Sequence, residues 1–261
     1  MDRLFQASIK ENKRLTEDHY ILTFCPFKKT IKPRPGQFFM LGVDRSLDPL
    51  LKRPFSLHRI LGKDFQILYR VRGKATTILK YKKTGDIINV LGPLGNGFPG
   101  LKLTMNEVHG KPILVAGGLG VAPLFSLAES IRDRKPLFFL GAKSKKELLC
   151  VNELKGIGIR PIIATDDGSA GRKGTVLNVL EDFLTHQSSI TSHLLYACGP
   201  REMLRELALL VKKFRIKAYA AFEENMACGI GACLSCAINT REGFKQVCKD
   251  GPVFPLEEIV W

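Results

Sequence analysis

The sequence lacks the features that place proteins in membranes or outside the cell. The stretch Ile113–Ala128 has only 16 residues and is interrupted by Gly117, Gly118, Gly120 and Pro123, whereas a membrane-spanning helix needs about 20 apolar residues. The N-terminus has no apolar central segment typical of a secretory signal. The cysteines are odd in number and unevenly spaced, which excludes a regular disulfide framework. We therefore expect a cytoplasmic protein without a membrane association.

Acidic residues are also scarce. Among 261 residues, 25 Asp and Glu stand against 40 Lys and Arg, a net charge of +15. Residues 1–110 carry 20 basic and 9 acidic side chains (+11), and residues 111–261 carry 20 and 16 (+4). Such an excess favours anionic partners. The sequence has no recognisable nucleic-acid module and no basic stretch interleaved with exposed aromatics, so we expect a solvated basic surface and no nucleic-acid partner.

Residues 1–104 have the pattern of a small antiparallel barrel. Short apolar runs are separated by proline and glycine turns, and Phe65, Ile67, Tyr69 and Val71 fall on one face of a period-2 repeat. This pattern predicts an antiparallel β-barrel domain. The expected strands cover His19–Phe24, Gln37–Val43, Phe65–Val71 and Asp86–Leu91.

Residues 111–217 repeat strand, turn and helix, which predicts a doubly wound parallel-sheet domain. Residues 218–261 are rich in cysteine and too few to bury a hydrophobic core of their own. We therefore expect a small C-terminal domain that needs a cross-link to stabilise it. The fold class is therefore mixed β and α/β, in three domains. The expected elements of the second domain are strands at 112–116, 136–142, 160–165 and 193–197, and helices at 124–134, 175–184 and 201–213.

Four of the seven cysteines lie in the last 34 residues. Cys228, Cys233 and Cys236 have the spacing C-x4-C-x2-C, and Cys248 follows after 11 residues, which is the spacing of plant-type 2Fe-2S ligation. The glycines of the first loop permit positive φ, so the loop can wrap a cluster and direct amides at its sulfides. A structural zinc site is the alternative, although it usually has two C-x2-C pairs. Two further cysteines, Cys25 and Cys150, are expected to be small buried hydrophobes without a function.

Three segments of the first domain have the chemistry of a flavin site. They are Arg53-Pro54-Phe55-Ser56, Tyr69-Arg70 and Gly73–Thr77. They offer two guanidinium groups for a pyrophosphate, rings able to stack on a flavin, and a helix N-terminus whose amides can bind phosphate. The alternative interpretation is that Phe55 and Tyr69 are core aromatics and that the arginines are surface charges.

Two turns of the second domain are typical of dinucleotide binding. In the segment Gly117–Pro123, Gly118 and Gly120 allow a pyrophosphate to approach the backbone, and Pro123 suits the first helical position. The segment Cys198-Gly199-Pro200 follows an expected strand at the carboxyl edge of the sheet, where ligands bind in open α/β folds. Cys198 lies either beside a nicotinamide ring or in tight packing under the loop. Cations at 143–146, after the second strand, leave the choice between NAD and NADP open.

The complete order of motifs resembles one family. The motifs are R-P-x-S, G-P-L-G-N-G-F (Gly92–Phe98), G-G-x-G-x-x-P, C-G-P, C-G-I-G-A-C-x-x-C and V-C-K-D-G-P-V-F (Val247–Phe254). They cover nearly the whole chain, which resembles the ferredoxin-reductase-like flavoproteins and in particular the electron-transfer subunits of bacterial dihydroorotate dehydrogenase B. The resemblance implies FAD on the barrel (residues 1–104), NAD on the α/β domain (111–217) and a 2Fe-2S cluster in the tail (218–261).

The resemblance also implies site residues. The family usually has Gly-Thr where this chain has Ala75-Thr76, so the phosphate turn has to tolerate a Cβ atom there. The gap between Cys236 and Cys248 is somewhat shorter than in the family, which shortens a loop and removes no ligand. The implied FAD contacts are Arg53–Ser56, Leu68–Arg70, Ala75 and Thr76, and the implied cluster ligands are Cys228, Cys233, Cys236 and Cys248.

The function implied by this likeness is that of an oxidoreductase subunit in pyrimidine biosynthesis. Electrons from dihydroorotate, oxidised at an FMN in a separate catalytic subunit, would pass singly through the cluster, pair on FAD and leave as hydride to NAD+. No side chain of this chain has to act as an acid or base. We expect a hetero-oligomer, and a chain that does not oxidise dihydroorotate alone.

Two other functions are left open. A reductase of the same architecture can serve ferredoxin, sulfur compounds or a hydrogenase, although such relatives tend to carry basic residues inside the cysteine loop, which here is uncharged. A zinc-stapled binding module that holds an anionic partner belongs to a different class. The only tryptophan, Trp261, covers the cluster, lies in a subunit contact or frays with the chain end.

Overall fold

The computed structural model describes residues 3–43, 48–100, 110–187 and 193–261. Its contacts group the chain into two compact units. The barrel unit comprises residues 1–97, 223–238 and 244–252, and the α/β unit comprises residues 98–222, 239–243 and 253–261. Among the described residues, no helix combines the length and the apolar content that crossing a membrane requires.

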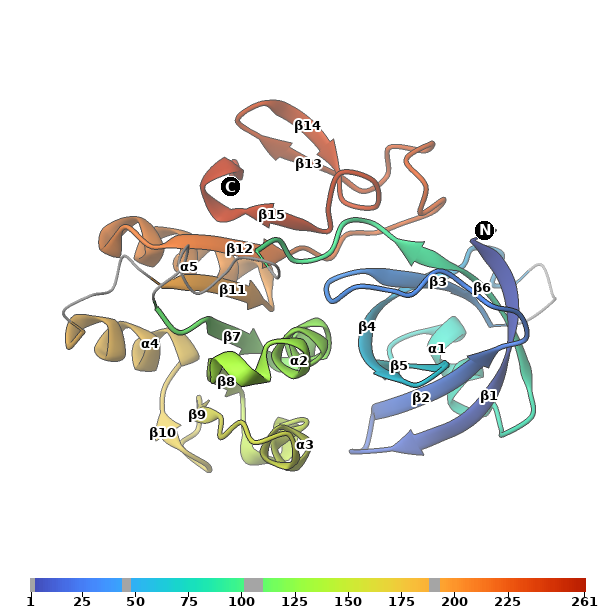
Figure 1. Ribbon diagram of the computed structural model, residues 1–261, viewed down its shortest axis with the longest axis horizontal. Helices are drawn as coiled ribbons and strands as arrows, with labels where there is room; N and C mark the ends of the chain where they lie inside the picture. Colours follow the sequence, from blue (N-terminus) through green and yellow to red (C-terminus); the bar gives the residue numbers. More distant parts are fainter. Residues whose placement is uncertain (1–2, 44–47, 101–109, 188–192) are drawn as a thin grey trace. The chain divides into compact units, whose positions relative to one another are not determined.

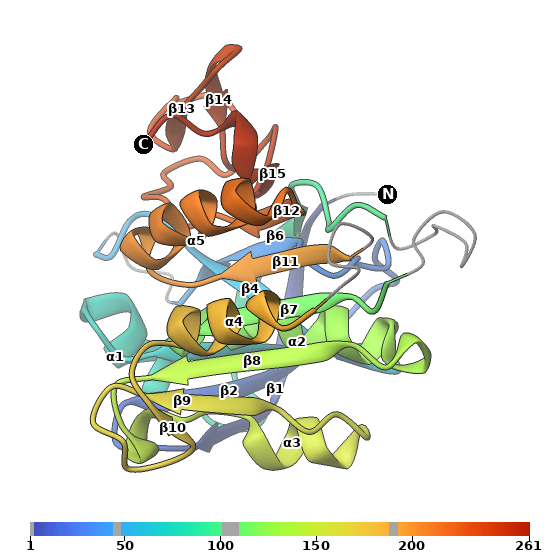
Figure 2. The same ribbon diagram turned by 90° about the vertical axis from the view of Figure 1, so that its left-hand side faces the viewer.

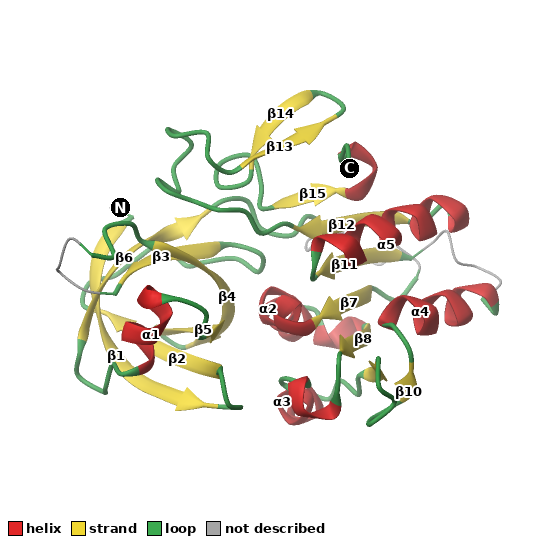
Figure 3. Ribbon diagram, turned by 180° about the vertical axis from the view of Figure 1, so that it is seen from behind, coloured by secondary structure: helices red, strands yellow, loops and turns green. Residues whose placement is uncertain are grey.

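The barrel unit contains a closed six-stranded barrel in which every pairing is antiparallel (Figure 1). The strand order is β1-β2-β5-β4-β3-β6, and the closed antiparallel barrel confirms the prediction of a barrel from the sequence. Seen along the barrel in Figure 3, α1 lies in front of or behind the interior of the ring of strands, and Figure 2 places it at one end of the barrel. The elements are β1 (Leu4–Arg14), β2 (His19–Pro26), β3 (Phe38–Gly42), β4 (Arg53–Leu61), β5 (Asp64–Arg70), α1 (Lys74–Lys80) and β6 (Ile87–Leu94).

The barrel interior is filled by the apolar face that the alternation in β5 predicts. Phe65, Ile67 and Tyr69 belong to one buried core cluster, and Val71 packs against it. Aromatic rings dominate this core, and the ring of Phe39 lies 5.4 Å from that of Phe65 in a stacked pair. Such close packing of large rings fixes the register of the strands around the barrel.

The α/β unit is built on a seven-stranded sheet of order β10-β9-β8-β7-β11-β12-β15. All its pairings are parallel except the one between β12 and β15. Helices α4 and α5 cover one face and α2 and α3 the other (Figures 1 and 2), which confirms the doubly wound architecture. The strands are β7 (Ile113–Gly117), β8 (Leu137–Ala142), β9 (Ile162–Thr165), β10 (Arg172–Lys173), β11 (Leu194–Cys198), β12 (Lys217–Ala221) and β15 (Val253–Pro255). The helices are α2 (Val121–Ser130), α3 (Val151–Gly156), α4 (Val176–Thr185) and α5 (Arg201–Phe214).

The contacts of the C-terminal segment 218–261 are divided between the two units. Strands β12 and β15 complete the edge of the large sheet, because apolar strands of three to five residues gain most from joining an existing sheet. Between them, β13 (Ala237–Thr240) and β14 (Gly243–Gln246) form a two-stranded sheet of their own.

Candidate functional site

The barrel unit brings the four predicted cluster ligands together as two pairs of thiols. One pair is Cys228 with Cys233, and the other is Cys236 with Cys248. An electrostatic interaction between Cys228 and Cys248 relates the two pairs. Cys233 is exposed, Cys228 is half-buried, and Cys236 and Cys248 are buried. One side of the site is therefore open to solvent and the other is enclosed by protein.

Backbone amides of the loop point at the sulfur atoms. The amides of Ile230 and Ala232 donate to Cys228 Sγ at 3.4 and 3.3 Å. The amide of Gly231 donates to Cys248 Sγ at 3.2 Å. Gly231 has a φ of +84°, a conformation that costs a residue with a Cβ atom roughly 1–2 kcal/mol. The glycine in this loop therefore permits a backbone conformation in which the amides point at cysteine sulfur atoms.

The two sides of the site differ in acidity. The hydroxyl and amide of Ser235 stabilise the Cys233 thiolate and lower its pKa to about 6. Burial and the neighbouring Cys236 thiol raise the pKa of Cys248 to about 12. A metal ion deprotonates a coordinating thiol outright, so all four cysteines would hold a cluster as thiolates.

The donor set fits a binuclear cluster. The four thiols form the two pairs described above. Two pairs supply two thiolates to each iron of a 2Fe-2S cluster, and donors to the sulfurs tune its potential. A tetrahedral zinc site would need all four thiolates around one point.

The segments that carry the cysteines contact the barrel, and two of the motifs shared with the dihydroorotate dehydrogenase B electron-transfer subunits take part in these contacts. Asn96, in the segment Gly92–Phe98, donates its side-chain amide to the carbonyls of Lys249 and Asp250 at 3.3 and 3.0 Å. On the other side of the loop, a Cβ atom on Gly229 would lie 2.7 Å from Met40 Cγ on β3. Met40 pairs with Pro54 on β4, so the cluster loop and the predicted flavin motif adjoin the same strand.

The predicted flavin segments come together on β4, β5 and α1. The rings of Phe55 and Tyr69 meet edge to face at 5.9 Å, and both belong to the barrel core. The Tyr69 hydroxyl donates to Asn12 Oδ1 at 3.1 Å. Their burial favours the second interpretation of these rings, in which they are core aromatics, over stacking on a flavin.

The two arginines of the flavin motifs are held in place by groups that sequence reasoning did not single out. Arg53 donates from Nη1 to the Leu51 carbonyl at 2.6 Å, and Arg70 donates from Nε to Asp18 Oδ2 at 2.5 Å. Burial opposes the charge of Asp18, but the hydrogen bond from Arg70 and the nearby His19 outweigh it, so the pKa of Asp18 lies below its ordinary value. A bond through Nε leaves the outer nitrogens of Arg70 available to a phosphate.

Helix α1 accommodates the departure at Ala75. Ala75 is buried and belongs to the barrel core, so its Cβ atom packs inward and leaves the outer side of the turn clear. The Thr76 hydroxyl accepts hydrogen bonds from the amides of Arg72 and Gly73 at 2.9 and 3.1 Å, which fixes the entry to the helix. The amides of the first turn have no acceptor within the helix.

In the α/β unit, the two predicted nucleotide turns lie side by side. They follow β7 and β11, which pair in parallel with Ala116 opposite Cys198. A Cβ atom on Gly120 would lie 1.9 Å from the Cys198 carbonyl oxygen. Only a glycine allows the two turns to approach each other this closely.

Three details of these turns differ from the sequence expectations or go beyond them. Pro123 is the third residue of α2 and not the first, because a 3-10 turn at Gly118–Gly120 precedes the helix. Proline has no backbone amide hydrogen, but this position lies in the first turn, so no intrahelical hydrogen bond is lost. Cys198 is only 1% exposed, which favours the packing interpretation over a place beside a nicotinamide ring. Met203, which no sequence motif indicated, packs against both turns. If Gly117 or Gly199 carried a Cβ atom, that atom would lie 2.7 or 3.0 Å from the Met203 sulfur.

The cysteines outside the cluster site behave as predicted from their surroundings. Cys25 and Cys150 are both buried. Burial raises the pKa of each thiol above its ordinary value. Both are therefore neutral, unreactive thiols near neutral pH.

Comparisons with known proteins agree with this arrangement. Residues 223–260 match the family model described as the iron-sulfur cluster binding domain of dihydroorotate dehydrogenase B, and residues 114–208 match the oxidoreductase NAD-binding domain. The chain is 40% identical over 98% of both lengths to proteins named dihydroorotate dehydrogenase B (NAD(+)), electron transfer subunit, from Caldanaerobacter subterraneus subsp. tengcongensis and Geobacillus kaustophilus. A solved structure of an NADH-dependent reduced ferredoxin-NADP oxidoreductase is 28% identical, with a TM-score of 0.83 over 98% of this chain and 90% of that one.

Proposed function

Because the chain belongs to the family of dihydroorotate dehydrogenase B electron-transfer subunits, we propose that it carries electrons between a partner subunit that oxidises dihydroorotate and NAD+. The proposal rests on one observation in the barrel unit. The four cysteine thiols form two pairs, and backbone amides of the loop point at their sulfur atoms. A site of this kind serves an electron carrier and has no acid or base positioned for substrate chemistry.

Cys228, Cys233, Cys236 and Cys248 would hold the 2Fe-2S cluster. Arg53 and Arg70 would neutralise the pyrophosphate of FAD, with Ser56, Leu68 and the first turn of α1 beside them. When bound, the cluster exchanges single electrons and the flavin exchanges either single electrons or a hydride. The chain itself supplies position, charge and the exclusion of water.

The two glycine turns of the α/β unit would hold NAD. Gly118 and Gly120 leave the backbone open to a pyrophosphate, and Gly199 and Pro200 border the same edge of the sheet. Cys198 contributes to this site through its backbone, because its carbonyl oxygen packs against Gly120. The curated relatives carry NAD(+) in their names, which supports NAD over NADP.

The exposed side of the cysteine loop suits a partner subunit. Beside the exposed Cys233, the apolar side chains of Ile230 and Leu234 are 59% and 66% exposed. Exposed apolar residues around a redox site indicate a docking surface, because a short distance between centres and the exclusion of water both serve electron transfer. We assign this surface to an FMN-containing catalytic subunit, in a hetero-oligomer.

The test is the metal and activity content of the anaerobically purified chain. We expect iron and acid-labile sulfide, bound flavin, and reduction of artificial dyes by NADH, without oxidation of dihydroorotate unless the catalytic subunit is added. Cys236→Ser removes a buried ligand, so iron should be lost, whereas the matched control Cys150→Ser changes a buried cysteine outside the site and should keep it. A chain without iron and sulfide, or one that oxidises dihydroorotate alone, would contradict the proposal.

A further inference from the structure

One asparagine connects two segments of the barrel unit that are assigned to FAD. Asn12 lies on β1, and neither the flavin motifs nor the implied FAD contacts include it. The Tyr69 hydroxyl of β5 donates to Asn12 Oδ1 at 3.1 Å. From the same side-chain amide, Nδ2 donates to the carbonyls of Leu79 and Lys82 at 2.8 and 3.1 Å. A single side chain therefore links β5 with the end of α1.

The carbonyls that Asn12 binds lie at the C-terminal end of α1. Asn12 Nδ2 also donates, at 3.3 Å, to the carbonyl of Lys80, the last residue of this seven-residue helix. The last carbonyls of a helix have no amide partner within it, and a helix of this length is unstable in water by itself. Contacts with the barrel therefore keep α1 formed. Ala75 and Leu79 supply apolar contacts from the core cluster, and Asn12 supplies polar ones.

The bond to Tyr69 fixes the direction in which the Asn12 amide faces. Burial raises the pKa of Tyr69 above its ordinary value, so the hydroxyl keeps its proton and donates it to Oδ1. Nδ2 is thereby turned toward α1. The ring of Tyr69 stacks on that of Tyr20 at 5.6 Å, and the next residue, Arg70, is assigned to the pyrophosphate.

The pairing of β1 does not require this side chain. The strand is held through its backbone, in which Asn12 pairs with Leu22 of β2, whereas the side chain bonds to Tyr69 and α1. The opposite end of α1 carries Ala75 and Thr76, the implied FAD contacts. Because a helix of this length spans only about 10 Å, a displacement at the Asn12 end also moves that turn.

We propose that Asn12 is a positioning residue of the FAD site. It holds the end of α1 against β5 and so keeps Ala75 and Thr76 in a fixed arrangement with Arg70 before the cofactor binds. FAD then does not have to supply the free energy that orders these segments. Asparagine suits this role because one side chain offers both donors and an acceptor. The inference rests on the proposed function, because it requires FAD at these segments.

The test is the retention of FAD by the complete, cluster-containing chain. Serial dilution of the flavin-containing protein, followed by the fluorescence of released FAD, gives the dissociation constant. Asn12→Ala should weaken FAD binding by about tenfold or more, because part of the binding free energy is then used to order α1. Asn12→Asp keeps the acceptor for Tyr69 but loses the donors to α1, so it should weaken binding to a similar extent.

The matched control is Asn89→Ala. Asn89 is a half-buried asparagine on β6 of the same barrel, and its side chain accepts a hydrogen bond from Gln6 Nε2 at 3.3 Å. This bond involves none of the segments assigned to FAD. The control should therefore leave the dissociation constant within about twofold of the wild-type value.

Two further measurements separate positioning from a general loss of structure. In Asn12→Ala, hydrogen exchange should become faster for the amides of residues 74–82 and stay unchanged for those of β2. Reduction of dyes by NADH should return to the wild-type rate at saturating FAD, so that only the FAD concentration for half of this rate is raised.

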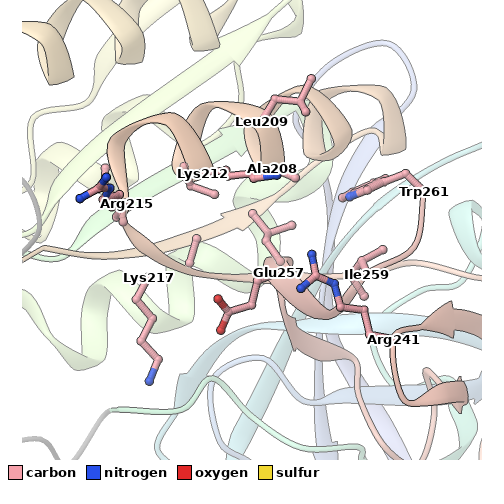
Figure 4. Close-up of a pocket in the computed structure, with 13 residues that line it drawn as sticks. Ala208, Leu209, Lys212, Arg215, Lys217, Arg241, Glu257, Ile259 and Trp261 are labelled. Atoms are coloured by element: carbon pink, nitrogen blue, oxygen red, sulfur yellow. The ribbon is translucent and has the colours of Figure 1, made fainter.

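Trp261 supplies the control for the α/β unit. Its ring lies 5.9 Å from that of Phe222, which excludes the frayed chain end that was one of the three possibilities for this residue. Trp261 borders a cavity of about 690 Å³ between α5 and the tail 256–261 (Figure 4). Phe222, the tail and Trp261 all belong to the α/β unit, so the urea midpoint of Trp261 emission should be the same in wild type and Asn12→Ala.

The possible failures are distinguishable. Unchanged FAD binding in Asn12→Ala, beside a wild type that binds FAD, would overturn the inference and leave the proposed function standing. A wild type without flavin would overturn the proposed flavin site itself. Normal FAD binding in Asn12→Asp would show that the link to α1 is unimportant, and a rate that stays low at saturating FAD would show a general defect. Either result would overturn the positioning role.

Discussion

The cysteine loop of the barrel unit and the glycine turn of the α/β unit both place glycine beside a proposed cofactor, but for different physical reasons. Gly229 has a φ of +72°, and the nearest obstacle to a Cβ atom is the flexible side chain of Met40. Gly120 has an ordinary helical conformation, with φ at −58°. At Gly120 a Cβ atom would instead meet the rigid backbone of Cys198 at 1.9 Å.

The comparison shows that one residue type answers two constraints. In the cysteine loop, glycine permits a left-handed backbone that directs amides at sulfur. In the βα turn, glycine permits two backbone segments to touch.

The unfolding of each unit can be followed separately. Trp261 belongs to the α/β unit, so its emission reports unfolding there. The proposed flavin site belongs to the barrel unit, so flavin release reports unfolding of the barrel.

The largest effect is expected for Gly120→Ala. The added methyl group cannot be accommodated by a side-chain rotation, because its nearest neighbours are the carbonyl oxygen and carbon of Cys198. We expect the α/β unit to lose about 3 kcal/mol of unfolding free energy or more. The measurement is the urea midpoint followed by Trp261 emission.

The control for this substitution is Gly118→Ala in the same turn. A Cβ atom on Gly118 has no neighbour within 4 Å, but the φ of +54° strains any other residue. We expect a loss of only about 1–2 kcal/mol. Equal losses for the two variants would show that close approach of the two turns is not the constraint at Gly120.

A smaller effect is expected for Gly229→Ala. Strain at positive φ should cost the barrel unit about 1–2 kcal/mol, and displacement of Met40 adds to this. The measurements are the urea midpoint of flavin release and the iron content. Gly62→Ala, in the same unit, has a φ of +62° and open space around the Cβ position, so it isolates the strain.

The difference between these two variants gives the contribution of Met40. If Gly229→Ala cost no more than Gly62→Ala, contact between the cysteine loop and β3 would be unimportant. A loss as large as that of Gly120→Ala would show that close packing, and not backbone conformation, dominates in both units.

The smallest effect is expected for Asp18→Asn. The pair between Asp18 and Arg70 is partly exposed, so its loss should cost less than about 1 kcal/mol. Because the folded state lowers the pKa of Asp18, the wild type has this contribution above the ordinary pKa of a carboxyl group and loses it as the pH falls through the lowered value.

The measurement is flavin release from both proteins at neutral and at acid pH. The difference between wild type and Asp18→Asn should be present at neutral pH and should vanish at low pH, while the Trp261 transition stays unchanged at both. A difference that grew toward low pH would have the wrong sign for a carboxylate partner of Arg70.

Sequence reasoning was most successful where the determining contacts are local. The alternation of Phe65, Ile67 and Tyr69 predicted the barrel core because neighbouring side chains on a strand point to opposite faces. The expected helix at 201–213 is found at Arg201–Phe214. The helix expected at 124–134 ends at Ser130 and continues as a 3-10 turn at Arg132–Arg134, since propensity leaves helix ends poorly defined.

The groups that support the sites carried no signal in the sequence. Asp18 lies 52 residues from Arg70, and Asn96 lies 153 residues from Lys249. No motif or periodicity relates residues so distant along the chain. The burial of Phe55 could not be decided either, because a strand residue on the inner face and one beside a flavin have the same pattern.

The sequence by itself determined the fold class, the cysteine spacing and the positions of the glycine turns, because each depends on residues within one strand, loop or helix. The tertiary structure alone decided that the segment 218–261 is divided between two units and that Cys198 is buried. The physical reason is that burial depends on which strands pair and which helices cover them, and pairing is a property of the whole chain.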